Sequence, residues 1–237
     1  MNNLDYVTVV VITKNEESNI RRCLESVAEF SNKIVVDSGS TDQTTRIAAN
    51  LGATVIHQEW LGFGKQKQFA IEASPTNWVL SLDADEEVSP DLAKSIQSAD
   101  LNDPTTGFLI NRRSYFLGKP VLYSGWNPDW VLRLVNKKAA HFTNDAVHER
   151  LTGCQKVVKL NGKIHHYSYQ SHADIDKKIN LYGALSRQTR KRNKSRVLVA
   201  TWTFARSFIF RLGFLDGVTG LHIALMNAKT SWIKYSD

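Results

Sequence analysis

The 237-residue chain is poor in cysteine, with only Cys23 and Cys154. Two cysteines argue against the disulfide framework on which small secreted domains depend. Cys23 also occupies an apolar position of a helical pattern, which predicts a small core residue. We therefore expect a chain that is held together by a hydrophobic core and resides in a reducing cytoplasm.

Other absences narrow the class of protein further. The N-terminal segment Met1–Asp5 has neither the basic nor the apolar region of a signal peptide, which predicts a cytoplasmic location. No low-complexity tract or internal repeat interrupts a composition of 42% hydrophobic and 22% charged residues, so a folded protein is expected. No Gly-x-Gly-x-x-Gly sequence follows the first predicted strand, which argues against a dinucleotide-binding dehydrogenase.

Acidic residues are scarce in the C-terminal third. Residues 151–237 hold 15 Lys and Arg but 4 Asp and Glu, a net charge of +11, whereas residues 1–150 hold 15 and 19, a net charge of −4. This asymmetry indicates that the C-terminal part meets an anionic partner, which is a membrane surface, a phosphorylated glycolipid or a nucleic acid.

The first 82 residues do contain an alternation of β-branched and amphipathic segments. Strands are predicted at residues 7–13, 33–36, 54–57 and 78–82, with helices between them at residues 16–30, 43–51 and 64–73. This alternation predicts an α/β fold with a parallel sheet covered by helices. Beyond residue 105, shorter strands at residues 107–111, 130–135 and 157–160 predict a mixed extension of that sheet.

The fourth predicted strand leads directly into a group of acids. Asp83 and Asp85, two residues apart, point to the same side of an extended backbone. Carboxylates brought together repel one another unless a cation offsets their charge, and oxygen ligands favour Mg²⁺ or Mn²⁺. The alternative is a solvated strand end, with Glu86 and Glu87 opening a helix near Ser89-Pro90.

Two other predicted strands end in polar, acidic segments, at residues 13–16 and 37–42. Ligands of parallel α/β sheets bind outside the carboxyl ends of the strands, so the three segments together predict one ligand site. The alternative for residues 37–42 is a turn in which Asp42 caps the next helix.

The order of these motifs resembles that of family 2 glycosyltransferases, which have the GT-A fold and transfer a sugar from a nucleotide diphosphate with inversion. The resemblance is carried by residues 10–17 (VVITKNEE), 35–42 (VVDSGSTD) and 82–85 (LDAD). It implies a GT-A fold with a mostly parallel sheet flanked by helices, followed here by a C-terminal helical appendage. One departure is Ser38, where many relatives carry a second Asp.

Three later segments resemble the lipopolysaccharide core β1,4-glucosyltransferase type, namely residues 124–134, 147–151 and 166–169. That resemblance implies transfer of a hexose, glucose in that type, from a UDP-sugar to the inner-core heptose region of lipopolysaccharide. A family 2 transferase acting on a polyprenyl phosphate or another polysaccharide fits the motifs as well. A basic nucleic-acid-binding protein is the distant alternative, and the acidic strand ends argue against it.

The predicted division of the chain follows from the same resemblance. Residues 1–170 would form the catalytic domain, with a nucleotide-binding half at about 1–105 and an acceptor half at about 106–170. Residues 171–237 would form a basic, amphipathic helical tail.

The resemblance also implies roles for the residues of the donor site. Asp85 would hold the metal ion, Asp83 would contact the ribose or a metal-bound water, and His166 would be a further metal or diphosphate ligand. The nucleotide and its phosphates would be bound by Thr13, Asn15, Glu16, Asp37, Ser38 and Lys67. The alternatives are a solvated helix lysine for Lys67 and a structural histidine for His166.

An inverting transfer needs a general base that takes the proton of the acceptor hydroxyl. Glu149 is the first candidate, because His148 and Arg150 flank it after a short apolar rise. Asp129 is the rival, in a Trp-rich segment like the one that supplies the base in other family 2 enzymes. Its alternative is a turn after Pro128.

The C-terminal part predicts contact with a membrane surface. Six of the ten residues in 187–196 are basic, and residues 197–215 are mainly apolar. As one helix, that segment would place Val197, Thr201, Phe204, Phe208, Leu212 and Leu215 on one face. Each of its two arginines would cost about 2.5 to 3.5 kcal/mol at the bilayer centre, so residues 187–215 are expected to lie on the anionic inner membrane. The alternatives are packing on the catalytic domain and oligomerisation.

Overall fold

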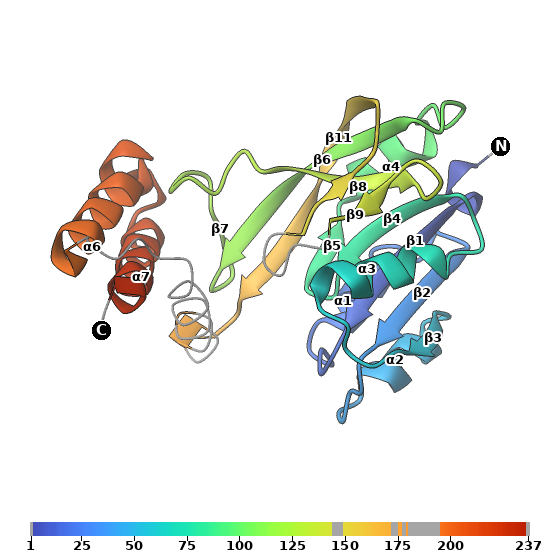
Figure 1. Ribbon diagram of the computed structural model, residues 1–237, viewed down its shortest axis with the longest axis horizontal. Coiled ribbons are helices and arrows are strands. Elements are labelled where there is room, and N and C mark those ends of the chain that lie inside the picture. The colour runs from blue at the N-terminus through green and yellow to red at the C-terminus, as the bar shows by residue number, and fades with distance from the viewer. Residues whose placement is uncertain (1, 144–148, 172–174, 177–178, 180–194, 236–237) are drawn as a thin grey trace. The chain divides into compact units, whose positions relative to one another are not determined.

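The computed structural model describes the chain except residues 1, 144–148, 172–174, 177–178, 180–194 and 236–237 (Figure 1). The described residues form two compact units. The first comprises residues 1–112 and 130–166, and the second comprises residues 113–129 and 167–237. Most of the basic run at residues 187–196 lies outside the described residues.

Four parallel strands form the N-terminal part of the sheet in the first unit. They are β1 (Val7–Thr13), β2 (Asn32–Asp37), β3 (Thr54–His57) and β4 (Trp78–Asp83), and they lie in the order β3-β2-β1-β4. The helices between them are α1 (Ile20–Glu25), α2 (Thr44–Asn50) and α3 (Phe63–Glu72). A short 3-10 turn at Asn3–Asp5 precedes β1. The parallel α/β prediction is confirmed, although α1 is shorter than the predicted helix at 16–30.

The sheet continues with antiparallel strands, which confirms the prediction that residues beyond 105 extend it as a mixed sheet. Beyond β4 follow β8 (Trp130–Asn136), β6 (Thr106–Phe116), β11 (Lys156–Tyr169) and β5 (Glu86–Val88). The pairs β4–β8, β6–β8 and β5–β11 are antiparallel. A separate two-stranded sheet pairs β9 (His141–Phe142) with β10 (Leu151–Thr152) in antiparallel orientation.

The acids after β4 do not open a helix. Glu86 and Glu87 belong to β5, and α4 (Pro90–Gln97) begins after Ser89, whose side chain accepts a hydrogen bond from the Leu92 N–H. The alternative in which these two glutamates start the helix is therefore wrong. An N-cap serine followed by proline starts α4 without them.

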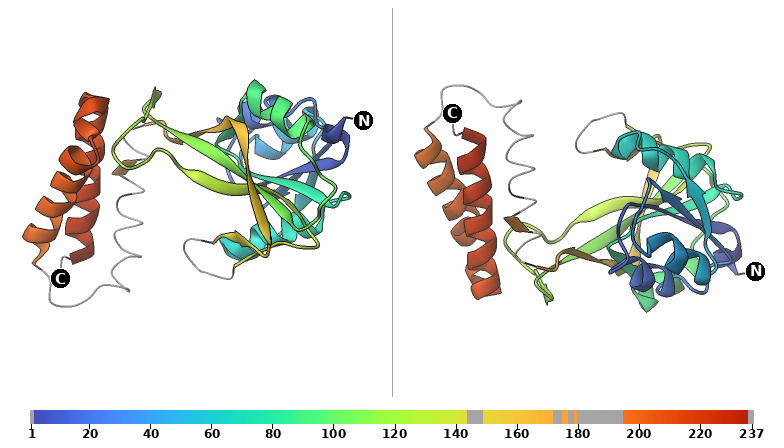
Figure 2. Two further views of the ribbon diagram at one scale, coloured as in Figure 1. Left: turned by 90° about the horizontal axis from the view of Figure 1, so that it is seen from above. Right: turned by 90° about the horizontal axis from the view of Figure 1, so that it is seen from below.

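Each face of the sheet has its own hydrophobic core. Val9 and Val11 of β1 pack in a cluster with residues of α1, α2 and α4, whereas Val10 packs in a cluster with Ala70 and Ile71 of α3. Because successive strand residues point to opposite faces, a single valine run supplies both cores. Figure 2 shows α4 and α3 on opposite sides of the sheet.

The second unit contains a helical hairpin and the end of β6. The short strand β7 (Lys119–Pro120) pairs with Tyr115 and Phe116 of β6. α6 (Arg196–Ala205) continues into a π-helical turn (Arg206–Phe210), and a 3-10 turn (Gly213–Asp216) leads to α7 (Val218–Tyr235). α6 and α7 lie side by side in Figures 1 and 2. Phe116 and Val121 pack against Ile223 and Met226 of α7.

Residues 197–215 do not form the single helix that the sequence predicted. The α-helix ends at Ala205, and Leu212 adopts a left-handed conformation with φ of 55°. A Cβ atom at Gly213 would lie 2.7 Å from the carbonyl oxygen of Ser207, so only glycine fits at this close approach. The predicted apolar face is therefore split by a reversal of the chain. Among the described residues, no helix combines the length and the apolar character needed to cross a membrane.

Candidate functional site

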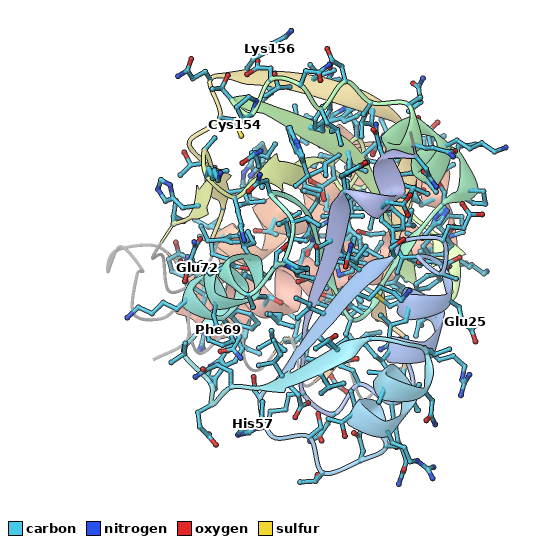
Figure 3. The ribbon with its side chains drawn as sticks, turned by 90° about the vertical axis from the view of Figure 1, so that its right-hand side faces the viewer. Glu25, His57, Phe69, Glu72, Cys154 and Lys156 are labelled. Carbon is cyan, nitrogen blue, oxygen red and sulfur yellow. The ribbon has the colours of Figure 1, made fainter. Side chains whose placement is uncertain are left out.

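The polar ends of the parallel strands meet at one edge of the sheet, as predicted. In the strand register, Thr13 lies opposite Asp37, Ile12 opposite Asp83, and Asp37 opposite His57. His57, at the end of β3, is labelled in Figure 3. The parallel pairing of these strands therefore places the segments that follow β1, β2 and β4 close together, although they are distant in sequence.

The loops after β1 and β2 are joined by hydrogen bonds. The Ser38 N–H donates to the Thr13 carbonyl (3.0 Å), the Asn15 N–H to Ser40 Oγ (2.8 Å), and the Thr41 N–H to Asn15 Oδ1 (2.8 Å). Asn15 has φ of 56°, a left-handed conformation that asparagine tolerates better than most residues. These bonds make the two loops one wall of the site.

Two acids of this wall hold its loops in shape. The buried carboxylate of Asp37 accepts hydrogen bonds from the Gly39 and Ser40 N–H groups (2.9 Å each) and from the Ser40 hydroxyl. The Glu16 side chain accepts a bond from the Asn19 amide (2.8 Å). The structure thus brings both predicted donor-site acids to the wall.

Two hydroxyl groups of the wall can form a further hydrogen bond with a ligand. Thr13 Oγ1 is buried and has no hydrogen-bond partner among the described residues. Ser38 Oγ accepts a bond from the fully buried amide of Gln66 (3.0 Å), which leaves its own O–H available to donate. Gln66 also donates to the Gln58 carbonyl (3.1 Å), so α3 supports this part of the wall.

Lys67 lies between two carboxylates and is only 8% exposed. Its Nζ atom is 2.8 Å from Asp83 Oδ1 and 3.0 Å from Glu149 Oε1. The alternative of a solvated helix lysine is therefore wrong for Lys67. One ammonium group links the strand-end acid to the candidate base, although Lys67 and Glu149 are 82 residues apart in sequence.

Arg133 and Glu86 complete this cluster and were not predicted as site residues. Arg133 Nη2 is 2.8 Å from Asp83 Oδ2 and 2.6 Å from Glu86 Oε1, and Arg112 Nη1 is 3.6 Å from the same Glu86 oxygen. Glu86 is fully buried. The sequence feature that indicates this ion pair is an arginine within the apolar run of β8, because a charged side chain in a buried strand requires a partner.

Electrostatics keep Asp83 and Lys67 ionised at neutral pH. Burial raises the pKa of Asp83, but Lys67 and Arg133 lower it by more, so it lies well below its usual range. Burial lowers the pKa of Lys67, but the carboxylates of Asp83 and Glu149 raise it above its usual value. The three cations Lys67, Arg112 and Arg133 thus face the three carboxylates of Asp83, Glu86 and Glu149.

The shifted pKa of Asp83 predicts a pH-dependent contribution to stability. A depressed pKa stabilises the folded state above the unfolded pKa of about 3.9, and this contribution is lost as the pH falls through the folded value. We expect Asp83→Asn to lower the free energy of unfolding by about 2 to 3 kcal/mol from pH 5 to 8, and by progressively less below pH 4.

Urea unfolding of both proteins between pH 2.5 and 8 measures this difference. Asp91→Asn, which changes an exposed aspartate of α4, is the control, and we expect its effect to stay within about 0.5 kcal/mol. A deficit of Asp83→Asn that stays constant down to pH 2.5 would contradict the prediction.

The two candidate bases lie in different units. Glu149 belongs to the first unit and lies beside the start of α3. A Cβ atom added at Gly64 of α3 would be 2.5 Å from the Thr143 carbonyl oxygen and 3.4 Å from Glu149 Cβ. Asp129 belongs to the second unit, and its role stays a prediction. His148, which flanks Glu149 in sequence, lies outside the described residues.

Of the predicted metal ligands, Asp85 and His166 lie together. Asp85 Oδ2 is 3.4 Å from His166 Nε2, and both side chains are largely buried. His166 reaches this position because it lies opposite Glu86 in the β11–β5 pair. Both oxygens of Asp83 instead contact Lys67 and Arg133. Within the described ranges, no group of three or more His, Cys, Asp or Glu side chains converges as a metal site.

Comparison with known proteins identifies the family. The model of glycosyl transferase family 2 matches residues 8–155. An uncharacterized glycosyltransferase of Rickettsia prowazekii is 34% identical over 96% of this chain and 85% of its own length. The lipopolysaccharide core biosynthesis glycosyltransferase LpsC of Rhizobium meliloti is 30% identical, over 60% of this chain and 56% of its own length.

A solved structure shares the fold. S. aureus TarS 1-349 in complex with UDP-GlcNAc superposes with a TM-score of 0.52, at 17% identity, over 94% of this chain and 79% of that one. The mixed α/β sheet flanked by helices is thus of the GT-A type, as predicted. From the family match and the relative in Rickettsia, we conclude that this chain belongs to glycosyl transferase family 2.

Proposed function

We propose that this glycosyltransferase moves a hexose, glucose first among the candidates, from a UDP-sugar to the inner-core heptose region of lipopolysaccharide, with inversion. One observation carries the proposal. Lys67 joins Asp83 at the end of β4 to Glu149, so leaving-group residues and a base-type carboxylate share one unit. The similarity to LpsC supports the lipopolysaccharide acceptor.

The wall formed by the first two loops would bind the nucleoside of the donor. The hydroxyl of Thr13, which has no partner among the described residues, and the donor capacity of Ser38 fit the carbonyl and N–H groups of a pyrimidine base. Asp37 would act mainly by holding the loop at 38–40, since three donors of that loop occupy its carboxylate. Asn15 and Glu16 would complete this part of the donor site.

A divalent cation fits the residues present. The cations of the cluster are already matched by carboxylates, so a bound diphosphate would need further positive charge. Asp85 and His166, with 3.4 Å between Oδ2 and Nε2, would together hold one Mg²⁺ or Mn²⁺, and such ions commonly take few protein ligands together with phosphate oxygens and water. The ion would neutralise charge on the leaving diphosphate.

Glu149 would act as the general base. The acceptor hydroxyl oxygen attacks the anomeric carbon from the face opposite the diphosphate, the bond from that carbon to the diphosphate oxygen breaks, and the hydroxyl proton passes to the carboxylate. Lys67 holds one oxygen of Glu149, which fixes the orientation of the carboxyl group. Asp129 is the second candidate for this proton.

The function is tested by the release of UDP from a panel of UDP-sugars. We expect turnover with UDP-glucose and a truncated heptose-containing core acceptor, and its loss when EDTA removes divalent ions. Transfer to a polyprenyl phosphate but not to the core acceptor would favour the alternative acceptor class. Failure to bind any UDP-sugar would contradict the proposal.

A lipopolysaccharide precursor is anchored in a bilayer, so its transferase must work at a membrane surface. We therefore propose that the protein acts on the cytoplasmic side of the inner membrane and associates with it peripherally. The excess of 15 basic over 4 acidic residues in 151–237 supports this location, because anionic lipids attract basic segments.

A further inference from the structure

The hairpin of α6 and α7 exposes many apolar side chains. Twelve of the nineteen large apolar side chains exposed in the described part of the chain lie between residues 197 and 232. Soluble proteins rarely expose a large contiguous apolar patch unless that patch binds a partner. A hairpin that displays so many of them needs a partner.

These side chains follow the helical repeat. On α6, Leu198 is 71% exposed and Trp202 follows four residues later. On α7, Val218, Leu221 and Leu225 are exposed at spacings of three and four residues. Each helix thus presents an apolar stripe that its packing in the hairpin does not cover.

The two stripes meet where the chain reverses between the helices. Six apolar residues of this reversal are exposed, and we call them the hairpin tip: Ile209, Phe210, Leu212, Phe214, Leu215 and Val218. Phe210 and Val218 are each 67% exposed. The ring of Phe210 contacts that of Trp202, with 5.5 Å between centroids, which joins the tip to the α6 stripe.

The tip is held in a defined shape. The carboxylate of Asp216 accepts hydrogen bonds from the Leu122 N–H, the Tyr123 N–H and the Ser124 hydroxyl (3.0 Å each). A Cβ atom at Gly220 would lie 1.8 Å from the Gly213 carbonyl, so the reversal is tightly packed. Its apolar side chains are therefore presented to solvent by a constrained turn.

The charge of the hairpin indicates which partner covers its tip. Residues 196–235 contain five basic residues and one acid, Asp216, whose carboxylate accepts hydrogen bonds from residues 122–124. Arg196, Lys229 and Lys234 lie toward the ends of α6 and α7 that are away from the tip, and Lys229 pairs with Asp176. Arg206 and Arg211 lie within the reversal itself. A second copy of this chain would bring the same positive charge to the contact, whereas an anionic lipid surface complements it. Apolar side chains flanked by arginines suit the boundary between headgroups and acyl chains.

We propose that the hairpin tip inserts into the headgroup region of an anionic bilayer, with the neighbouring basic side chains on lipid phosphates. This inference deepens the membrane location given under the proposed function and rests on it only for the identity of the membrane. The inserting element is the reversal between α6 and α7, instead of the single helix that the sequence predicted at residues 197–215.

Flotation of the full chain with lipid vesicles tests the proposal. We expect binding to vesicles of phosphatidylcholine with phosphatidylglycerol, binding at least tenfold weaker to phosphatidylcholine alone, and weakening by salt. The double variant Phe210→Glu/Val218→Glu should bind anionic vesicles at least tenfold less tightly. Val157→Glu, which changes an exposed valine of the first unit, is the matched control and should bind like the natural chain.

Circular dichroism and UDP-sugar binding report whether the double variant is folded. If it is not, Ile209→Ser/Leu215→Ser provides a milder change at the same tip. Unchanged vesicle binding by a folded tip variant, or no binding of the natural chain to anionic vesicles, would overturn the proposal. So would a lipid-independent dimer, detected by sedimentation, that the tip variants dissociate. Vesicle binding requires no catalysis, so its failure is distinct from failure of the proposed transfer.

Discussion

Replacement of Glu149 by glutamine is expected to lower the rate of sugar transfer by a factor of about 10² to 10⁴, the usual contribution of a general base. Glutamine keeps the size of the side chain but cannot take the proton of the acceptor hydroxyl. Lys67 would keep its ion pair with Asp83, so the donor side of the site should stay intact. UDP affinity should therefore change by no more than about threefold.

Two measurements separate these effects. Steady-state transfer gives kcat with the acceptor at saturation, and calorimetric titration with UDP gives the donor-side affinity. Asp129→Asn is the matched comparison, because it makes the same acid-to-amide change at the rival position. Normal turnover of Glu149→Gln together with a large loss in Asp129→Asn would assign the base to Asp129. A large loss of UDP affinity in Glu149→Gln would indicate a structural role.

Replacement of Arg133 by methionine is expected to have the largest effect on stability. The change leaves the fully buried Glu86 without the guanidinium that lies 2.6 Å from it, and removes one of the two cations that hold Asp83. Loss of one partner of a buried ion pair typically costs about 3 to 5 kcal/mol, because the remaining charge stays buried. For a chain of this length, that loss lowers Tm by roughly 10 °C.

Chemical and thermal unfolding of purified variants measure this effect. Arg112→Met is the control, since Arg112 is 25% exposed and 3.6 Å from the same Glu86 oxygen, and we expect a loss of about 1 kcal/mol or less. Arg133→Lys should recover only part of the stability, because an ammonium group is more strongly hydrated than a guanidinium group and therefore costs more to bury. Equal losses in Arg133→Met and Arg112→Met would contradict a central role for Arg133.

The predicted site was most accurate where local patterns determine the structure. The bounds of β1 and β3 match the predicted strands, because valine-rich runs and short turns specify extended segments locally. The convergence of Thr13, Asp37 and Asp83 followed from parallel topology alone. The prediction missed Glu86 and Arg133, because their role depends on the placement of β8 and β5 in the sheet.

The C-terminal hairpin shows the same limit. Periodicity over residues 197–215 fits one helix, since the apolar spacing changes little across the reversal. The reversal depends on the left-handed Leu212 and on the close approach of Gly213 to Ser207. Asp216 further anchors it through residues more than ninety positions earlier in the chain. A helical wheel contains neither the backbone contact nor the distant anchor.

The sequence by itself determined the family, the parallel part of the sheet and the edge at which its polar strand ends meet. These properties depend on hydrophobic periodicity and on residues close together in the chain. The tertiary structure alone decided that Lys67 contacts both Asp83 and Glu149, and that Arg133 neutralises Asp83 and Glu86. The reason is that an ion pair depends on distance in space, and these partners lie about 50 to 80 residues apart in the chain except for Asp83 and Lys67.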